Sequence, residues 1–424
     1  MWSNDREILR ELAKQKAEIA ALPIQQKTKK QWYALNALQP ERPMFTIDQL
    51  PWHEMDVNNE LKLRCEDPFA REVENMLRRE LYQWNHFRDD HVIEPFIFIP
   101  KIINNVGYGL EIDAEVAEWD DGSVSEKKLT DLSADINSYV YHDQLQSEDD
   151  LEKLKIPNIT LNQELTAKRE EMAKDALNGI LEVRMNGREF GIYPIDYIYM
   201  WRGTESFFID FIDQPEFMNK LIKKVADITH AILDQLEEKA LLCQPQQIIH
   251  CSGAWTDQLP QEGFNPDKPR AKDIWGGGMS QIFSSMSPAD HDKYDIEYFK
   301  SVYERFGLVA YGCCESLEDK IQYVKKIKNV RKISMSPWVQ NRNKGAEQLG
   351  KEYIYWAKPS PTILLENCWD PKAALADVQD IYDVCKRHNT PLEYDMKDVS
   401  TLNNRPQTIW EWAKMMREFV GRAD

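Results

Sequence analysis

The sequence contains no apolar run that approaches the roughly 20 residues a membrane-spanning helix needs. Its first residues, Met-Trp-Ser-Asn-Asp-Arg-Glu, lack the apolar segment and the small-residue cleavage site of a signal peptide. Its seven cysteines form no short, regular framework of the kind that stabilises small secreted domains. These absences predict a soluble, cytoplasmic protein with reduced thiols and no membrane partner.

Basic charge is also scarce. Lysine and arginine total 53 against 71 aspartates and glutamates, which gives a net charge of −18, and no segment forms a basic block. Because such an acidic field repels a phosphate backbone, we expect no nucleic-acid partner.

The common local motifs for phosphate and metal binding are missing too. The triple glycine at 276–278 belongs to no Gly-x-Gly-x-x-Gly pattern and precedes no Walker lysine, so we expect a mobile loop there and not a phosphate site. There is no Cys-x-x-Cys pair and no His-Glu-x-x-His helix. No single local motif therefore predicts a metal site.

The sequence is rich in alternating elements. Residues 1–90 read as a helical N-terminal extension, with amphipathic patterns over 3–22 and 60–88 that would pack against the main body or a second subunit of a homodimer. Beyond them, short apolar runs alternate with helical patterns. The predicted strands are 95–100, 190–198, 246–250, 307–312, 331–335, 361–366 and 391–394. The predicted helices include 214–239, 288–306, 316–327, 341–352, 371–388 and 406–421.

This alternation is typical of a parallel sheet, and its seven or eight repeats favour a closed barrel. We therefore predict an α/β fold, a (β/α)8 TIM barrel over residues 91–424. The acidic, turn-rich residues 113–177 fit the pattern poorly, and we expect an irregular insertion there.

Reactive side chains of such barrels lie where the strands end, at the carboxyl edge. Several thiols, acids and one histidine follow predicted strands, and zinc takes thiolate, imidazole and carboxylate ligands. The candidate metal ligands are Cys314, Cys313, His250 and Glu393. The candidate catalytic acids are Glu315, Asp395 and Asp257.

The adjacent cysteines in Tyr-Gly-Cys-Cys-Glu, 311–315, leave three interpretations open. Consecutive strand residues face opposite sides, so at most one thiol should face the barrel unless the chain has already turned, and a bend at Gly312 favours Cys314. Both thiols could instead be core residues, since cysteine is often buried. A cysteine nucleophile would require an activating histidine, for which His250 is the candidate.

Four further residues could bind substrate at the same edge. Arg202 and Lys358 could hold a carboxylate, or could form salt bridges at the rim. Trp255 and Trp338 could line an apolar cavity, or could belong to the core.

Three segments together resemble the uroporphyrinogen decarboxylase superfamily: the run from Trp-Arg-Gly-Thr-Glu at 201–217, Ser-Met-Ser-Pro-Ala-Asp at 285–290, and Tyr-Gly-Cys-Cys-Glu at 311–315. The resemblance extends from about residue 90 to the C-terminus and implies a TIM barrel. The porphyrinogen decarboxylases carry Arg-Gln-Ala-Gly-Arg on the first strand, where this chain has Phe-Ile-Phe-Ile-Pro-Lys. The resemblance therefore favours the other branch, the cobalamin-dependent methyltransferases.

Members of that branch that act on thiols bind zinc through a His-x-Cys segment and a later cysteine. In this chain Tyr-Gly-Cys-Cys-Glu takes the first position, and acids near 393–395 replace the later cysteine. The resemblance thus implies a ligand set such as Cys314, Glu315 and Glu393, which would suit a metal that polarises an oxygen. It also allows a metal-free site with Glu393 or Asp395 as general acid.

We therefore expect a methyltransferase that moves a methyl group between a corrinoid protein and a small molecule, with zinc as a candidate cofactor. A cofactor-free decarboxylase with Asp257 or Asp395 as proton donor is the alternative. A third alternative is a catalytically silent barrel that binds a corrinoid or folate protein.

Overall fold

The centre of the protein is a parallel sheet of seven strands in the order β1-β16-β15-β14-β13-β12-β9. The computed structural model describes residues 3–117, 124–128, 139–365 and 367–422. The predicted α/β class is confirmed, whereas closure into an eight-stranded barrel stays a prediction. The strands are β1 Met44–Ile47, β9 Gly191–Ile192, β12 Trp275–Gly278, β13 Leu308–Tyr311, β14 Val330–Met335, β15 Ile354–Ala357 and β16 Leu392–Met396.

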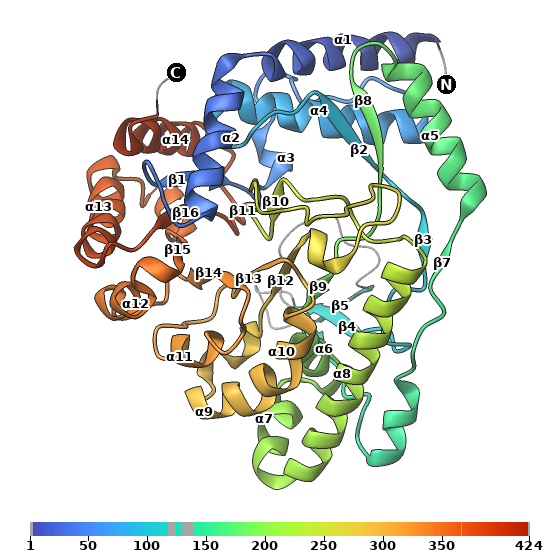
Figure 1. Ribbon diagram of the computed structural model, residues 1–424, viewed down its shortest axis with the longest axis vertical. Coiled ribbons are helices and arrows are strands. Elements are labelled where there is room, and N and C mark those ends of the chain that lie inside the picture. The colour runs from blue at the N-terminus through green and yellow to red at the C-terminus, as the bar shows by residue number, and fades with distance from the viewer. Residues whose placement is uncertain (1–2, 118–123, 129–138, 366, 423–424) are drawn as a thin grey trace.

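Helices cover the outer face of this sheet (Figure 1). Side chains that point outward from the strands pack beneath them; the hydroxyl of Tyr394, for example, donates a hydrogen bond to the carbonyl of Val378, 2.6 Å away. The covering elements are α6 Pro194–Arg202, α7 Thr204–Asp213, α8 Pro215–Glu238, α9 Pro288–His291, the π-helix Asp292–Ile296, α10 Glu297–Tyr303, α11 Ile321–Val324, α12 Arg342–Leu349, α13 Pro371–His388 and α14 Gln407–Val420.

The N-terminal helices form a layer along one end of the molecule (Figure 1). They bury a cluster of their own that includes Leu9, Leu77 and Leu177, in which α1 meets α4 and α5. The predicted helices at 3–22 and 60–88 are therefore present, although β1, inside the range expected to be only helical, joins the main sheet. The elements are α1 Ser3–Ala20, α2 Pro23–Asn36, α3 Trp52–Met55, α4 Pro68–His86 and α5 Gln163–Leu177, with β2 Phe96–Pro100 paired to β8 Glu182–Asn186.

Two strand predictions differ from the structure. Residues 361–366 were expected to form a strand, but Pro361–Leu364 is a 3₁₀ helix. The strand that occupies this place in the sheet is β15, Ile354–Ala357. Pro361 lacks the N–H that a central strand needs, so the preceding apolar run Ile-Tyr-Trp-Ala takes the place in the sheet. The strand expected over 190–198 ends at Ile192, because Pro194 begins α6.

The triple glycine at 276–278 is a buried strand, β12, and not the expected mobile loop. A Cβ atom on Gly276 would lie 2.7 Å from the ring of Phe306, and one on Gly277 would lie 2.9 Å from Ile249. Glycine is needed there because neighbouring side chains press against both faces of the strand.

The insertion expected to be irregular contains regular elements. A three-stranded antiparallel sheet forms from its first half, and α5 forms its end, where the side chain of Asn162 accepts a hydrogen bond from the backbone of Leu165. The sequence did not predict these elements because the segment is acidic and rich in turn residues. Residues 118–123 and 129–138 of the insertion lie outside the described chain. The strands are β4 Ala114–Ala117, β5 Val124–Lys128 and β6 Tyr139–Tyr141, and β3 Ile103–Asn104 pairs separately with β7 Thr160–Leu161.

A short hairpin, β10 Ile248–Ile249 and β11 Ser252–Gly253, packs on the inner face of the main sheet. It is held by Lys332 and Glu393, whose side chains are fully buried with 2.6 Å between Nζ and Oε2. Lys332 also donates hydrogen bonds to the Ser252 hydroxyl and the Gly253 carbonyl, and Glu393 accepts one from the Gly253 amide. The ion pair fastens the hairpin to β14 and β16.

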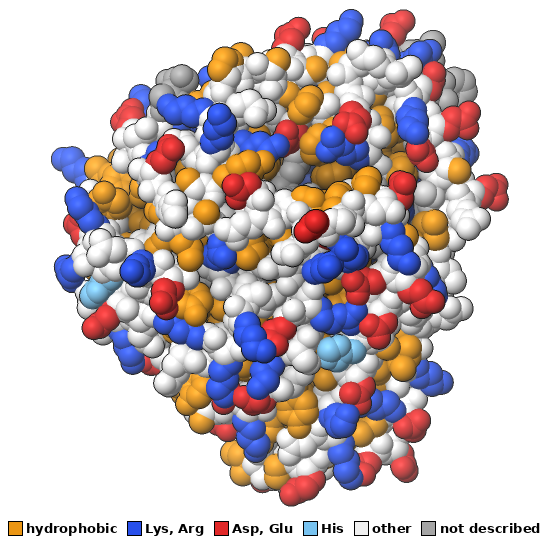
Figure 2. Space-filling model, viewed as in Figure 1, with side chains coloured by type: hydrophobic (Ala, Val, Ile, Leu, Met, Phe, Trp, Pro, Cys, Tyr) orange, Lys and Arg blue, Asp and Glu red, His pale blue; other side chains and the backbone are white. Residues whose placement is uncertain are grey.

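Acidic and basic side chains are interspersed over the face shown in Figure 2. None of the helices in the described part of the chain combines the length and the apolarity that a membrane crossing requires.

Candidate metal and thiol site

Both thiols of the Cys313–Cys314 pair face one site. β13 ends at Tyr311, and Gly312, with a φ of +98°, turns the chain immediately afterwards. The two sulfurs lie 3.4 Å apart. The pair lies after the turn and not in the alternating strand, which is the case in which both thiols can face the same side.

Gly312 should be required for this turn. A Cβ atom there would lie 2.5 Å from Leu317 and 2.9 Å from Ser334, in a backbone region that L-residues avoid. We expect Gly312→Ala to lower the free energy of unfolding by about 2 kcal/mol in urea titrations. Gly350→Ala is the matched control, because Gly350 also has a positive φ but no atom within 4 Å of the added Cβ. Equal losses in the two variants would contradict the steric argument.

The end of β16 brings a cation and an acid to the thiols. Lys397 Nζ donates to Cys313 Sγ at 3.0 Å, and Cys314 Sγ donates to Asp398 Oδ2, also at 3.0 Å. One ligand atom from each of Cys313, Cys314 and Asp398 lies within 4.8 Å of the others. The imidazole Nε2 of His250 lies 3.5 Å from Lys397 Nζ. The predicted thiols thus meet here, with His250 beside them.

Lys397 and Asp398 were missed by the sequence reasoning. The predicted strand ended at 394, which directed attention to Glu393 and Asp395, but β16 continues to Met396. The residues that lie at the carboxyl edge of the sheet are therefore Lys397 and Asp398, which directly follow the strand. The alternation Glu-Tyr-Asp-Met over 393–396 was the signal that the strand continued.

The backbone of Cys313 is fixed from several sides. Its amide donates to Glu315 Oε2 at 2.7 Å, while its carbonyl accepts from Lys358 Nζ at 2.9 Å and from Ser334 Oγ at 2.7 Å. Glu315 also accepts a hydrogen bond from the Ser280 amide. Glu315 and Lys358, predicted as a catalytic and a substrate-binding residue, therefore position the thiol loop in this structure.

The surroundings make the two thiols unequal. A hydrogen bond from the Cys314 thiol, together with the positive charge of Lys358 and a hydrogen bond with His250, lowers the pKa of Cys313 despite its burial. The hydrogen bond to Cys313 and burial raise the pKa of Cys314. Burial acts to lower the pKa of Lys397, but the negative charge on Cys313 raises it overall. The site therefore favours one thiolate and one thiol beside an ammonium group.

Asp395 and Glu393 lie inside the sheet and away from solvent. Glu393 is paired with Lys332, so its carboxylate is already occupied. Asp395 accepts a hydrogen bond from Trp356 Nε1 through Oδ2 at 3.3 Å, and its Oδ1 has no hydrogen-bond partner. Burial raises the pKa of Asp395 well above its usual value, which favours a protonated carboxyl group.

The remaining predicted residues are dispersed. Arg202 is buried in an ion pair with Asp210, 2.6 Å away, and in another with Asp143. Trp255 packs beside Trp32 in the core, with 6.0 Å between the ring centroids. Two others are exposed: Asp257 on the loop after β11, and Trp338, 61% exposed, after β14.

Comparisons with known proteins give a structural likeness only. No protein-family model matches the chain, and no curated sequence matches it. A methyltransferase from Methanosarcina mazei is similar in structure, with 12% sequence identity and a TM-score of 0.48 over 92% of this chain and 98% of that one. Any assignment of function rests on the chemistry of the site.

Proposed function

We propose that this protein is a methyltransferase that moves a methyl group between a corrinoid carrier and a small molecule at the Cys313–Cys314–Asp398 cluster. The observation that carries the proposal is the convergence of two thiols and a carboxylate at the ends of β13 and β16. Such a cluster at the carboxyl edge of a parallel sheet is where α/β enzymes place their reactive groups.

The donor set fits zinc. Two sulfurs and one carboxylate oxygen are ligand types that zinc takes, and catalytic zinc sites keep one position open for substrate. Cys313, Cys314 and Asp398 would hold the metal, and His250 is a fourth candidate because it lies beside Lys397. Bound zinc would supply Lewis acidity that lowers the pKa of an acceptor group and makes it a nucleophile.

The chain's own residues would prepare the site for this chemistry. Lys397 balances the negative charge on Cys313 and can hold a proton beside it. Lys358 and Ser334 fix the carbonyl of Cys313, so that the sulfur is held in place before substrate binds. Trp338 offers an exposed aromatic face at the same edge, where we propose that a corrinoid protein approaches.

A decarboxylase is the second candidate, and Asp395 favours it. A buried carboxyl group with a raised pKa and an oxygen without a hydrogen-bond partner can act as a proton donor. Such an enzyme would not require the thiol cluster to hold a metal.

Metal content distinguishes the two candidates. We expect the purified protein to contain about one zinc ion per chain, and Cys314→Ala to lose most of it, because three protein ligands are typical of a catalytic zinc site. Cys368→Ala is the matched control, since Cys368 is an exposed free cysteine. Metal would be measured by plasma mass spectrometry after dialysis against a weak chelator.

Methyl transfer itself is tested by the spectral conversion of methylcobalamin to cob(I)alamin when candidate acceptors are added. Absence of zinc from wild type and both variants, with no spectral conversion, would reject the zinc methyltransferase and favour the decarboxylase.

A further inference from the structure

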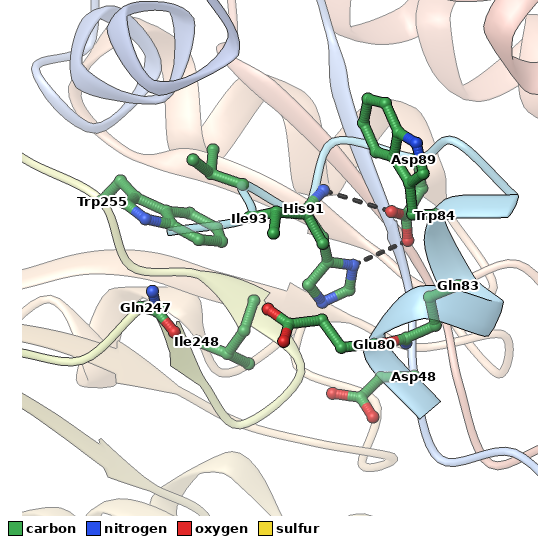
Figure 3. A pocket seen from close by; sticks show the side chains of 11 residues that line it. Asp48, Glu80, Gln83, Trp84, Asp89, His91, Ile93, Gln247, Ile248 and Trp255 are labelled. Carbon is green, nitrogen blue, oxygen red and sulfur yellow. Dashed lines mark hydrogen bonds and ion pairs between the residues drawn. The ribbon is translucent and has the colours of Figure 1, made fainter. Parts of the chain in front are cut away.

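A cavity of about 240 Å³ (Figure 3) lies beside Asp48, where β1 ends at the carboxyl edge of the sheet. Its floor includes Asp48, the residue after β1, whose amide donates to the carbonyl of Met396 at 2.9 Å. Met396 directly precedes Lys397, whose Nζ lies 3.0 Å from Cys313 Sγ in the thiol cluster. Helix α4, the segment 89–93 and the β10 strand complete its walls.

His91 presents a positively charged donor to this cavity. Its Nδ1 is hydrogen-bonded to Asp89 Oδ2 at 2.7 Å, and the same oxygen accepts from the Ile47 amide at 2.9 Å. The ring is therefore fixed, and its other nitrogen, Nε2, points into the cavity (Figure 3). Burial acts to lower the pKa of His91, but the charge and the hydrogen bond of Asp89 raise it to about 9. A neutral solution thus leaves the imidazole protonated.

Acceptors of opposite charge face the same space. The carboxylates of Glu80 and Asp48 line the cavity. Among the described residues, Lys16 Nζ donates a hydrogen bond to Glu80 Oε2, 2.5 Å away. On the other side, Ile248 and Trp255 form an apolar wall (Figure 3). The cavity therefore offers a cationic donor, two anionic acceptors and an apolar surface.

We propose that this cavity binds a small ammonium carboxylate of amino-acid size. The ligand's carboxylate accepts a hydrogen bond from His91 Nε2, its ammonium group is held by Glu80 and Asp48, and its alkyl part lies against Ile248 and Trp255. Drug-sized ligands occupy cavities of roughly 300–1,000 Å³, so a cavity of about 240 Å³ suits a smaller molecule. The site needs neither a metal nor a methyl donor.

Calorimetry with three matched compounds tests the proposal. L-norvaline carries both charged groups, pentanoate lacks the ammonium group, and butylamine lacks the carboxylate. We expect norvaline to bind at least about tenfold more tightly than either analogue, because each analogue leaves a charged group of the cavity unpaired. Comparable or tighter binding of butylamine or pentanoate would overturn the assignment.

Variants then locate the binding. We expect His91→Gln to weaken norvaline binding at least about tenfold and to leave butylamine binding unchanged, because only the carboxylate contact is lost. Glu80→Gln should weaken both compounds. His230→Gln is the matched control on α8, where the imidazole bonds only to Ser301 among the contacts of the described chain.

The result is separable from the proposed methyl transfer. Norvaline should bind equally to wild type and to Cys314→Ala, with or without chelator, because the cavity does not include the thiols. Circular dichroism melting would verify that each variant is folded. Failure of wild type to bind norvaline at millimolar concentration, or equal binding by both Glu80→Gln and the control, would overturn the proposal whatever the metal content.

Discussion

Replacing Lys332 by methionine should lower the free energy of unfolding by about 3–5 kcal/mol, because it would leave the buried charge of Glu393 without a partner. Both side chains are fully buried, and the lysine also satisfies Ser252 and the Gly253 carbonyl. Methionine fills a similar volume, so the loss would come from charge and hydrogen bonding more than from a cavity. Urea unfolding followed by tryptophan fluorescence measures the difference.

Two further variants define the origin of that effect. Lys332→Met combined with Glu393→Leu should recover much of the lost stability, since a buried pair replaced by apolar residues is often nearly neutral. Lys344→Met removes an exposed pair with Asp319 and should cost less than about 1 kcal/mol. If Lys332→Met were as mild as Lys344→Met, the ion pair would not hold the hairpin on the sheet.

Cys313→Ser should reduce the rate of methyl transfer more than about a hundredfold, because loss of even an outer-shell partner of a metal ligand typically costs about 10–100-fold. Cys313 is the thiol with the lowered pKa, and it lies in contact with both Lys397 and Cys314. A serine hydroxyl would stay protonated at neutral pH and would be a poor zinc ligand. The conversion of methylcobalamin to cob(I)alamin measures the rate.

The control for this variant is Cys368→Ser, which changes an exposed thiol outside the site and should retain full activity. We expect Lys397→Met to have a rate of methyl transfer between those of Cys313→Ser and wild type, since it removes the cation but keeps both sulfurs. Wild-type rates in Cys313→Ser would exclude this sulfur from the chemistry and would leave the thiol cluster without a catalytic role.

Sequence patterns predicted well those elements whose signals are local. The helix expected over 371–388 is confirmed as α13, since Asp370 caps its start and Asn389, in the left-handed conformation, ends it. Strand β15 was missed because four apolar residues next to a proline-rich segment gave no clear choice between neighbouring runs. The glycine strand β12 was missed because its requirement for glycine comes from Phe306 and Ile249, which the local sequence does not reveal.

The same limit applies to the site. The two cysteines could be selected from their place after a predicted strand, but the contact between Cys314 and Asp398 joins residues 84 positions apart. That pairing depends on where β16 ends, and a boundary error of two residues shifted attention to Glu393 and Asp395. The role of Lys332 as the buried counter-ion of Glu393 had no sequence signal, because a lysine in a strand is usually exposed.

The register of β1 has a consequence for how the protein is made. Met44 pairs with Glu393, so the first strand of the sheet finds its partner about 350 residues later in the chain. During synthesis α1 can already dock on α4, but the edge of β1 stays unpaired until β16 has left the ribosome. An exposed strand edge invites association with other chains. Folding in the cell should therefore depend on chaperones that shield this edge until the last strand arrives.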